Sequence, residues 1–402
     1  MVATNVIPLK DADFWQDPYP TLAGIREEFR VGRTDAGQQA ILRWDDCVDL
    51  ITGGNVIAGG LRQLDERGFK PGDPLYEWRR NAIGILDGPE HLRIRSLVNR
   101  ALTHRTVNHL RDAVRTYANE IIDRFDAEGR IDVRFDYAEA LPRFVRTQFL
   151  GLSEEEVAIS TEQMKTGPAE GFGPFVTAEI REQSNASIAA MMAYVTELYE
   201  DRRARPRDDL LTNLIEAEAE GQRLSHGELI TLFTTLFAAF GSSASTIVSG
   251  IYELARHPDQ AALFRSNPVA WKKGAAEETF RSHPALYSIG RKTARPFEAF
   301  GTEFDADELL TIQTGAPNRD PRRWHQPDRF DITRDPGLWS MTFGMGSHFC
   351  LGQALARCEV QEALAVFVER CDAIQLDSQP KWTPFVIRAQ LADLPVRYRP
   401  TA

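Results

Sequence analysis

The chain has little cysteine and no long apolar run. Both features limit the classes of protein to which it can belong. Its 402 residues include four cysteines, Cys47, Cys350, Cys358 and Cys371, and these lack the paired spacing of a disulfide framework. No stretch of eighteen consecutive apolar residues occurs, and the polar segment 1–11 resembles neither a signal peptide nor a membrane anchor. We therefore expect a cytoplasmic protein.

The chain is acidic overall and has no segment of linker-like composition. The 58 acidic residues outnumber the 47 basic ones, and the resulting formal net charge of −11 argues against nucleic acid as the main partner. No segment rich in proline, glycine or serine divides the chain, and no internal repeat is visible. With 43% apolar residues, the chain can bury a large core. We predict one domain over residues 1–402, although the length alone would allow two or three.

What the chain does have is helical patterning. Apolar residues recur at helical spacing and predict helices at 25–29, 45–52, 91–100, 107–128 and 187–203. Short runs typical of strands lie at 39–44 and 309–314. The sequence therefore predicts a mainly α fold with a small β-sheet region.

The clearest helix begins at Ser225. Ser225 and Glu228 have the S-x-x-E spacing of a capping box. The apolar run continues to Arg256 and ends before His257-Pro258, because the residue that precedes a proline disfavours helix. This is roughly 31 residues, or about 46 Å at 1.5 Å per residue. A helix so long and so apolar is expected to cross the protein interior.

One cysteine stands in a glycine-rich frame near the C-terminus. Residues 343–352 follow the pattern F-G-x-G-x-H-x-C-x-G, with Cys350 as its cysteine. The glycines allow the backbone to approach a flat partner closely, and the amides of a following helix favour negative charge on the sulfur. A lone cysteine is usually an ordinary buried residue. This frame instead favours a thiolate held against a metal.

The pattern resembles the heme-binding loop of the cytochrome P450 family, and the likeness runs from residues 17–20 to the region of Arg388. It implies a P450-type helical prism and a heme-thiolate monooxygenase of the soluble, bacterial type, with heme b as cofactor. Cys350 would be the axial iron ligand, whose electron donation helps to break the O–O bond. In the same loop Phe343 would pack beside the sulfur, Gly344, Gly346 and Gly352 would allow close approach, and His348, which alone is more often structural, would point at a heme propionate.

Further heme contacts are implied by the same resemblance. His91 and Arg95 form an H-x-x-x-R pair one helical turn apart, and both would reach one propionate. Arg291 would bind a propionate as well, because a guanidinium pairs with a carboxylate in two bonds. A solvated surface face is the alternative for these residues.

An E-x-x-R motif lies between the long helix and the cysteine loop. Glu278 and Arg281 alone could be a commonplace ion pair on a helix. Followed by the P-D-R-F segment 327–330, they resemble the structural Glu-Arg-Arg triad of the family, with Arg329 as the third member. The triad would hold the region under the heme by charge-assisted bonds.

The long helix departs from the family pattern. Where members usually have A-G-x-[acid]-T-T, residues 238–246 are AAFGSSAST when the register is set from His257-Pro258. Gly241 then replaces the acid and Ser242 replaces the threonine, with Ser243 next to it. Ser242 keeps a hydroxyl for proton delivery during oxygen activation, and Gly241 has no side chain for it. Alternatively, the small residues make room for substrate or bend the helix, and both interpretations can hold.

Substrate contacts are less sharply defined. By resemblance the pocket would include Ala238, Leu286, Tyr287, Phe172 and Phe385, and the Gly- and Pro-containing segment 167–182 would be a flexible lid. Phe172 is equally compatible with packing under a loop. The run Trp78-Arg79-Arg80 could meet an acidic substrate, and a solvated charge explains it at least as well.

The function expected from the resemblance is the insertion of one oxygen atom from O2 into a small, apolar or aromatic organic substrate. Electrons would come from a separate ferredoxin or flavodoxin with its reductase, and a local basic patch of Arg100, His104, Arg105 and Arg357 would bind that partner. No nucleic acid and no membrane is expected, and a monomer is the default. Gly241 motivates one alternative, a peroxide-driven or specialised biosynthetic oxidase. A non-catalytic heme sensor or ligand carrier is another.

Overall fold

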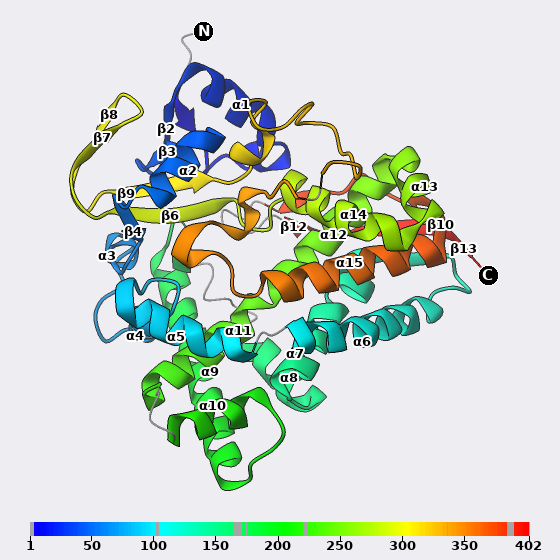
Figure 1. Cartoon of the computed structure of the whole chain (residues 1–402), viewed down its shortest axis with the longest axis horizontal. Coiled ribbons are helices and arrows are strands. Elements are labelled where there is room, and N and C mark those ends of the chain that lie inside the picture. Colours follow the sequence, from blue (N-terminus) through cyan, green and yellow to red (C-terminus); the bar gives the residue numbers. More distant parts are fainter. Residues whose placement is uncertain are drawn as a thin grey trace. The chain divides into compact units, whose positions relative to one another are not determined.

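The computed structural model describes residues 4–101, 104–163, 171–173, 175–219, 224–335, 337–383 and 390–401. Its elements are shown in Figure 1. The chain forms two compact units: unit 1 comprises residues 1–56, 104–142 and 241–402, and unit 2 comprises residues 57–103 and 143–240. A single domain over residues 1–402 stays a prediction.

Unit 1 holds most of the sheet residues and the helices of the C-terminal part. Its helices, with the short 3-10 and π segments labelled η, are η1 (Phe14–Gln16), α1 (Tyr19–Glu28), α2 (Trp44–Thr52), α6 (His104–Asp123), η2 (Val133–Ala138), α12 (Gly241–Arg256), α13 (Pro258–Ser266), α14 (Pro268–Ser282), η4 (Pro317–Arg319), η5 (Met341–Phe343), η6 (Gly346–His348) and α15 (Gln353–Arg370). Its strands are β1 (Val6–Ile7), β2 (Val31–Thr34), β3 (Gln39–Ile41), β5 (Arg130–Asp132), β6 (Ser288–Thr293), β7 (Phe297–Ala299), β8 (Thr302–Phe304), β9 (Leu309–Gln313), β10 (Cys371–Leu376), β11 (Trp382–Thr383), β12 (Gln390–Leu391) and β13 (Pro395–Pro400).

Unit 2 is almost entirely helical. Its helices are α3 (Arg62–Glu66), α4 (Pro74–Asn81), α5 (Gly88–Ala101), α7 (Ala140–Leu150), α8 (Glu154–Gln163), α9 (Ala178–Ala204), α10 (Leu210–Ala219) and α11 (His226–Ala239). The short strand β4 (Val56–Ala58) and the start of α7 lie where the chain passes from unit 1 into unit 2. The predicted mainly α fold with a small sheet region is therefore confirmed.

The predicted helices exist, and they differ from the prediction at their ends. The helix predicted at 187–203 is the C-terminal part of α9, which begins at Ala178 because Thr177 caps it by accepting a bond from the Ile180 amide at 3.2 Å. The helix predicted at 107–128 is α6, which ends at Asp123. The missed first turns of α9 are mostly polar and carry no apolar stripe, whereas residues 124–128 after α6 form turns.

The main sheet of unit 1 contains both predicted strand segments. Five of its strands follow the order β1-β2-β3-β9-β6, and β3 and β9 are parallel neighbours with Ala40 opposite Thr311. β6 runs antiparallel to β9 and places Arg291 opposite Leu310. All five residues of β9 are buried, as expected for a central strand covered on both faces.

The long apolar helix has the predicted boundaries and one interruption. Ser225 and Glu228 form the reciprocal capping box, and Glu228 also pairs with Arg93 of α5. α12 ends at Arg256 as predicted, but a turn at Phe240 separates α11 from α12 just before Gly241. Among the described residues, the span His226–Arg256 is the one helix long and apolar enough to cross a membrane, and 71% of its most apolar window is buried in the protein.

α12 crosses unit 1 and packs against both α14 and α15. Figure 1 shows α15 running between these helices and α6, which it also contacts. The close approach depends on Gly250, because a Cβ there would lie 2.8 Å from Leu364 Cδ2 and 3.1 Å from Thr279 Oγ1. α12 and α15 are thereby held in direct contact at Gly250 and Leu364.

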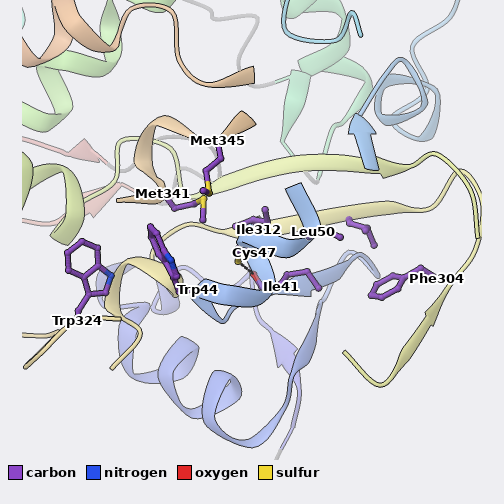
Figure 2. Packing of buried hydrophobic residues seen from close by; sticks show 10 residues of the cluster. Ile41, Trp44, Cys47, Leu50, Phe304, Ile312, Trp324, Met341 and Met345 are labelled. Atoms are coloured by element: carbon purple, nitrogen blue, oxygen red, sulfur yellow. Dashed lines mark hydrogen bonds between the residues drawn. The ribbon is translucent and has the colours of Figure 1, made fainter. Parts of the chain in front are cut away.

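The core beside the sheet also anchors the cysteine loop. Figure 2 shows a cluster of buried residues from α2, β3, β9 and the segments that follow them. Met341 and Met345 belong to this cluster and lie on either side of Phe343-Gly344 in the sequence. Burial of both methionine side chains therefore fixes the first half of the loop against the sheet.

Candidate active site

The loop around Cys350 is a closed turn ahead of α15. Gly344 and Gly346 have φ values of 69° and 65°, which only glycine adopts without strain, and the Cys350 amide donates to the Phe343 carbonyl at 2.9 Å. Cys350 is exposed, and α15 begins three residues later with Gly352 as its N-cap. The sulfur thus lies at a helix N-terminus, where the amide dipoles favour a thiolate.

The other three cysteines of the chain have a different environment. Cys47, Cys358 and Cys371 are buried. Burial raises the pKa of the Cys358 thiol to about 11 and the pKa of the other two further above the ordinary value. They remain neutral thiols at physiological pH. Cys350 is therefore the cysteine of this chain suited to bind a metal as a thiolate.

Aromatic and charged contacts brace the loop from behind. The Phe343 ring packs edge-on against Phe280 of α14 at 4.7 Å between centroids. The Arg357 guanidinium lies 4.4 Å from the Phe343 centroid and pairs with Glu277. Arg357 was predicted to bind a redox partner, and the structure shows its side chain engaged in holding Phe343. The side chains of the other predicted patch residues, Arg100, His104 and Arg105, lie outside the described residues.

The E-x-x-R pair is buried and saturated with hydrogen bonds. Arg281 donates through Nε and Nη2 to the two carboxylate oxygens of Glu278 at 2.7 and 2.8 Å. Its Nη1 donates to the carbonyls of Asn318 and Pro327 at 2.9 and 2.7 Å. The Asn318 side chain in turn accepts from the Met341 amide at 2.7 Å. The pair is thus connected to the start of the cysteine loop.

The third arginine of this triad is Arg334, and the assignment of Arg329 was wrong. Arg334 Nε donates to Glu278 Oε1 at 3.1 Å, and its Nη2 donates to the Arg329 carbonyl at 2.9 Å. Arg329 is an exposed residue that contributes its backbone carbonyl, which also accepts from Arg281 at 3.2 Å. The turn at 331–334 brings Arg334 back over Glu278, so a residue five positions later in the sequence occupies the place predicted for Arg329.

The start of α12 carries the predicted hydroxyl residues and a carboxyl group that the sequence did not reveal. Gly241 is the first residue of α12, Ser242 follows half-buried and Ser243 is buried. The Ser243 side chain hydrogen-bonds Glu359 of α15, which is 1% exposed. In the described part of the chain, Glu359 Oε1 has no hydrogen-bond partner. Burial raises the pKa of Glu359 to about 8, so it holds a proton at neutral pH.

Sequence reasoning missed Glu359 although a signal was present. It is one of two glutamates on the buried stripe of α15, and it is flanked by Cys358 and Val360. A carboxyl group at such a position must be paired or neutral. Glu362, also buried, is paired with Lys272 at 2.7 Å and with Arg111. Glu359 has no such basic partner in the described residues.

The remaining predicted heme contacts occupy three elements. Arg291 is buried on β6, and its Nη1 donates to the Gly290 carbonyl at 2.8 Å. His348 is half-buried in the cysteine loop. In unit 2, buried His91 and half-buried Arg95 stand one turn apart on α5, as the H-x-x-x-R spacing predicted.

Comparisons with known proteins agree with this geometry. A family model described as Cytochrome P450 matches residues 273–394, which include Glu278, Arg281 and the cysteine loop. Cytochrome P450 107B1 of Saccharopolyspora erythraea is 35% identical, and the match covers 96% of each chain. The chain belongs to the cytochrome P450 family. A second relative of the same organism, 6-deoxyerythronolide B hydroxylase, is 31% identical over 98% of this chain and 99% of its own.

A solved cytochrome P450 shares the whole architecture. The crystal structure of the myxobacterial cytochrome P450 CYP267B1 in complex with myristic acid superposes with a TM-score of 0.89 at 28% identity, over 97% of this chain and 98% of the other. The predicted P450 fold and the assignment to the P450 monooxygenases are confirmed. Membership of this family implies a heme-iron cofactor and an organic substrate.

The residues present suit that cofactor. The exposed sulfur of Cys350 would supply a single thiolate ligand, and a Cβ added at Gly352 would meet no atom within 4 Å, so the loop leaves open space next to the cysteine. The positive φ values of Gly344 and Gly346 flatten the loop without side chains that would obstruct a planar group. The loop of this cytochrome P450 therefore fits a heme.

The predicted substrate residues divide into described and undescribed ones. Leu286 is 38% exposed and able to contact a ligand. Tyr287 is a correction, because it is buried and its hydroxyl is bonded to that of Tyr19 at 2.6 Å, which leaves it a packing role. Phe172 is half-buried in unit 2. Phe385 and the Ala238 side chain lie outside the described residues.

Proposed function

We propose that this cytochrome P450 inserts one oxygen atom from O2 into a small, apolar or aromatic organic substrate, with electrons from separate redox partners. The observation that carries the proposal is the exposed Cys350 in its glycine frame at the start of α15, in a chain whose other cysteines are buried. The heme, as heme b, supplies oxygen activation when it is bound. The two units act as one heme-thiolate catalytic domain.

The heme-contacting residues have separate tasks in this proposal. Cys350 Sγ would hold the heme iron as a thiolate, Phe343 would shield the sulfur, and Gly344 and Gly352 would allow close approach. His91, Arg95, Arg291 and His348 bind the propionates. Glu278, Arg281 and Arg334 hold the polypeptide behind the cysteine loop, because both arginines bond the Glu278 carboxylate and also donate to backbone carbonyls.

Proton supply is assigned to Glu359 and the hydroxyls of α12. Gly241 provides no acid, whereas Glu359 is a neutral carboxylic acid whose one resolved partner is Ser243. A group with a pKa of about 8 gives up and regains a proton readily near neutral pH. We infer that Glu359 holds the proton, that Ser243 passes it on, and that Ser242 orients it toward the oxygen site. Glu359 of α15 then takes the role of the acid that family members usually carry at the position of Gly241 in α12.

The names of the relatives support a role in biosynthesis. One relative is a 6-deoxyerythronolide B hydroxylase, and CYP267B1 was crystallised with myristic acid, a molecule with an apolar chain. We propose a natural-product intermediate with an apolar or aromatic body as the substrate. Ferredoxin or flavodoxin with its reductase would deliver the electrons, to a monomeric protein in the cytoplasm.

The test is turnover of the purified holoenzyme with ferredoxin, reductase, NADH and isotopically labelled dioxygen. One labelled oxygen atom per product is expected, and Cys350→Ser should abolish it. Product formed only with hydrogen peroxide would instead favour the peroxide-driven oxidase that Gly241 motivates. Ligand binding without product under either condition would favour a sensor or carrier.

A further inference from the structure

Three arginines of unit 2, Arg67, Arg79 and Arg146, lie in surroundings that desolvate them, and they differ in their hydrogen-bond partners. Arg67 donates through Nε to the Gly173 carbonyl and through Nη1 to the Gln63 carbonyl at 2.6 Å. Arg79 of α4, across the described residues, makes no side-chain hydrogen bond and no ion pair. Its guanidinium lies 5.0 Å from the centroid of the Phe172 ring.

Arg79 differs from Arg67 and Arg146 because, among the described residues, it makes neither an ion pair nor a side-chain hydrogen bond. Burial alone lowers the pKa of Arg79 to about 10, so the guanidinium is still charged at neutral pH, although part of the side chain remains accessible. Arg202, which is 1% exposed, pairs with Glu156, Asp201 and Asp209. Arg146, which is 7% exposed, donates through Nη2 to Thr161 Oγ1 at 2.5 Å. A desolvated cation without an anion costs free energy, and this cost disappears when an anion binds.

A second unpartnered donor lies beside Arg79. Trp78 is 5% exposed, and within the described part of the chain its indole Nε1–H has no acceptor. The Trp78 ring lies 6.1 Å from that of Phe172, so Trp78 and Arg79 contact the same aromatic side chain. The position of Phe172 is fixed by Gly171, where a Cβ would lie 2.7 Å from Leu75 Cδ2.

We propose that Arg79 is a specificity-determining residue that binds the carboxylate of an organic acid substrate, with Trp78 Nε1–H as a second donor and Phe172 against the apolar body. The inference rests on the proposed function, because it names the substrate class of that site. A guanidinium suits a carboxylate because it can form two parallel bonds. The net charge of −11 repels organic acids at long range, so their selection requires a local cation of this kind.

A heme propionate offers the same carboxylate chemistry. Four other basic residues, His91, Arg95, Arg291 and His348, are already assigned to the two propionates. The substrate is therefore the favoured source of the carboxylate, and the experiment below separates the two sources.

The experiment measures binding of matched acids and esters to the ferric holoenzyme by calorimetry and by the heme spin-state shift. The probes are dodecanoate with methyl dodecanoate, and 4-phenylbenzoate with its methyl ester. In the wild type at least one acid should bind about ten- to a hundredfold more tightly than its ester. Arg79→Met should remove this preference and Arg79→Lys should keep part of it. Arg80→Met, on the same helix but exposed and paired with Glu77, should leave it unchanged.

Two further readouts distinguish substrate binding from other roles. Because Arg79→Met removes an unpaired, desolvated charge, the urea midpoint of the ligand-free protein should rise, and a fall would indicate a structural role and contradict the proposal. Heme transfer to apomyoglobin should be as slow as in Arg80→Met. Faster heme transfer from the Arg79→Met variant would mean that Arg79 binds a heme propionate. That result would also contradict the proposal.

The inference and the proposed function fail in different ways. Equal affinity of the wild type for acids and esters, no binding of either acid, or a preference that survives in Arg79→Met would refute the acid site while oxygen insertion could still be measured. Arg79-dependent acid binding without oxygenated product from any bound compound would support the acid site and refute the monooxygenase.

Discussion

Two glutamates of unit 1, Glu278 and Glu359, are equally buried and have opposite surroundings. Glu278 accepts bonds from Arg281, Arg334 and the Asp331 amide, whereas the resolved partner of Glu359 is one serine hydroxyl. The first carboxylate is neutralised by its neighbours, and the second avoids charge by keeping a proton. The comparison teaches that a buried ionisable group with partners of opposite charge stabilises the fold. A buried ionisable group without such partners is available for proton transfer or for binding a ligand.

The largest expected change in stability follows from substitution of Glu278, the glutamate that is paired with arginines. Glu278→Gln leaves buried Arg281 and half-buried Arg334 without their shared carboxylate, so the free energy of unfolding should fall by about 3–5 kcal/mol. Urea denaturation measures this, and heme retention should fall with it because Asn318 connects the network to the cysteine loop. The exposed Glu298→Gln is the control, and a Glu278 variant as stable as that control would contradict the account.

A change at Glu359, the glutamate that keeps its proton, should raise the free energy of unfolding at high pH, whereas the change at Glu278 lowers it. The unfolded glutamate ionises near the ordinary pKa of 4.5, but folded Glu359 keeps its proton up to a pKa of about 8. The folded state therefore binds more protons between these pH values, so stability falls as pH rises through that range. Glu359→Gln removes this dependence and should be more stable than the wild type above pH 8, by on the order of a few kcal/mol.

Urea denaturation at several pH values tests this expectation. Infrared spectra should also show a protonated carboxyl band at pH 7 that Glu359→Gln lacks. Equal pH dependence of stability in wild type and variant would mean that Glu359 is not a neutral acid.

A smaller effect on stability separates Arg334 from Arg329. Arg334→Gln removes a charged bond to Glu278 and should cost about 1.5–3 kcal/mol. Arg329→Gln keeps the backbone carbonyl that accepts from Arg281 and should stay within about 0.5 kcal/mol of the wild type. Urea denaturation of both variants decides between the two arginines, and the reverse order would restore the assignment made from the sequence.

The smallest effect on the fold is expected at Ser242. Ser242→Ala should leave the free energy of unfolding nearly unchanged but raise the hydrogen peroxide released per NADH consumed, because the hydroxyl that orients the proton is lost. A peroxide assay with redox partners measures this ratio. Ser249→Ala is a matched control on the same helix, since the Ser249 hydroxyl bonds only the Ser245 carbonyl among the described residues. Unchanged coupling in Ser242→Ala would exclude Ser242 from proton delivery.

The features that the sequence predicts correctly are contained in short, contiguous patterns. The capping box at Ser225, the end of α12 before His257-Pro258 and the cysteine loop are each specified within a few residues by backbone chemistry. Arg334 could not be predicted in this way, because the turn after Phe330 decides which arginine reaches Glu278. Glu359 was not found because its significance depends on the contact between α15 and Ser243 of α12. Arg79 was noted, but its lack of a partner is a property of the folded unit.

The measurement that tests the central claim most directly is product formed per NADH consumed as a function of pH, for wild type and Glu359→Gln with ferredoxin and reductase. The account predicts efficient coupling in the wild type up to a pH of about 8 and a decline above it, as Glu359 loses its proton. Glu359→Gln should be poorly coupled at every pH. Coupling in Glu359→Gln that equals the wild type across the whole range would contradict the claim that this buried acid replaces the one missing at Gly241.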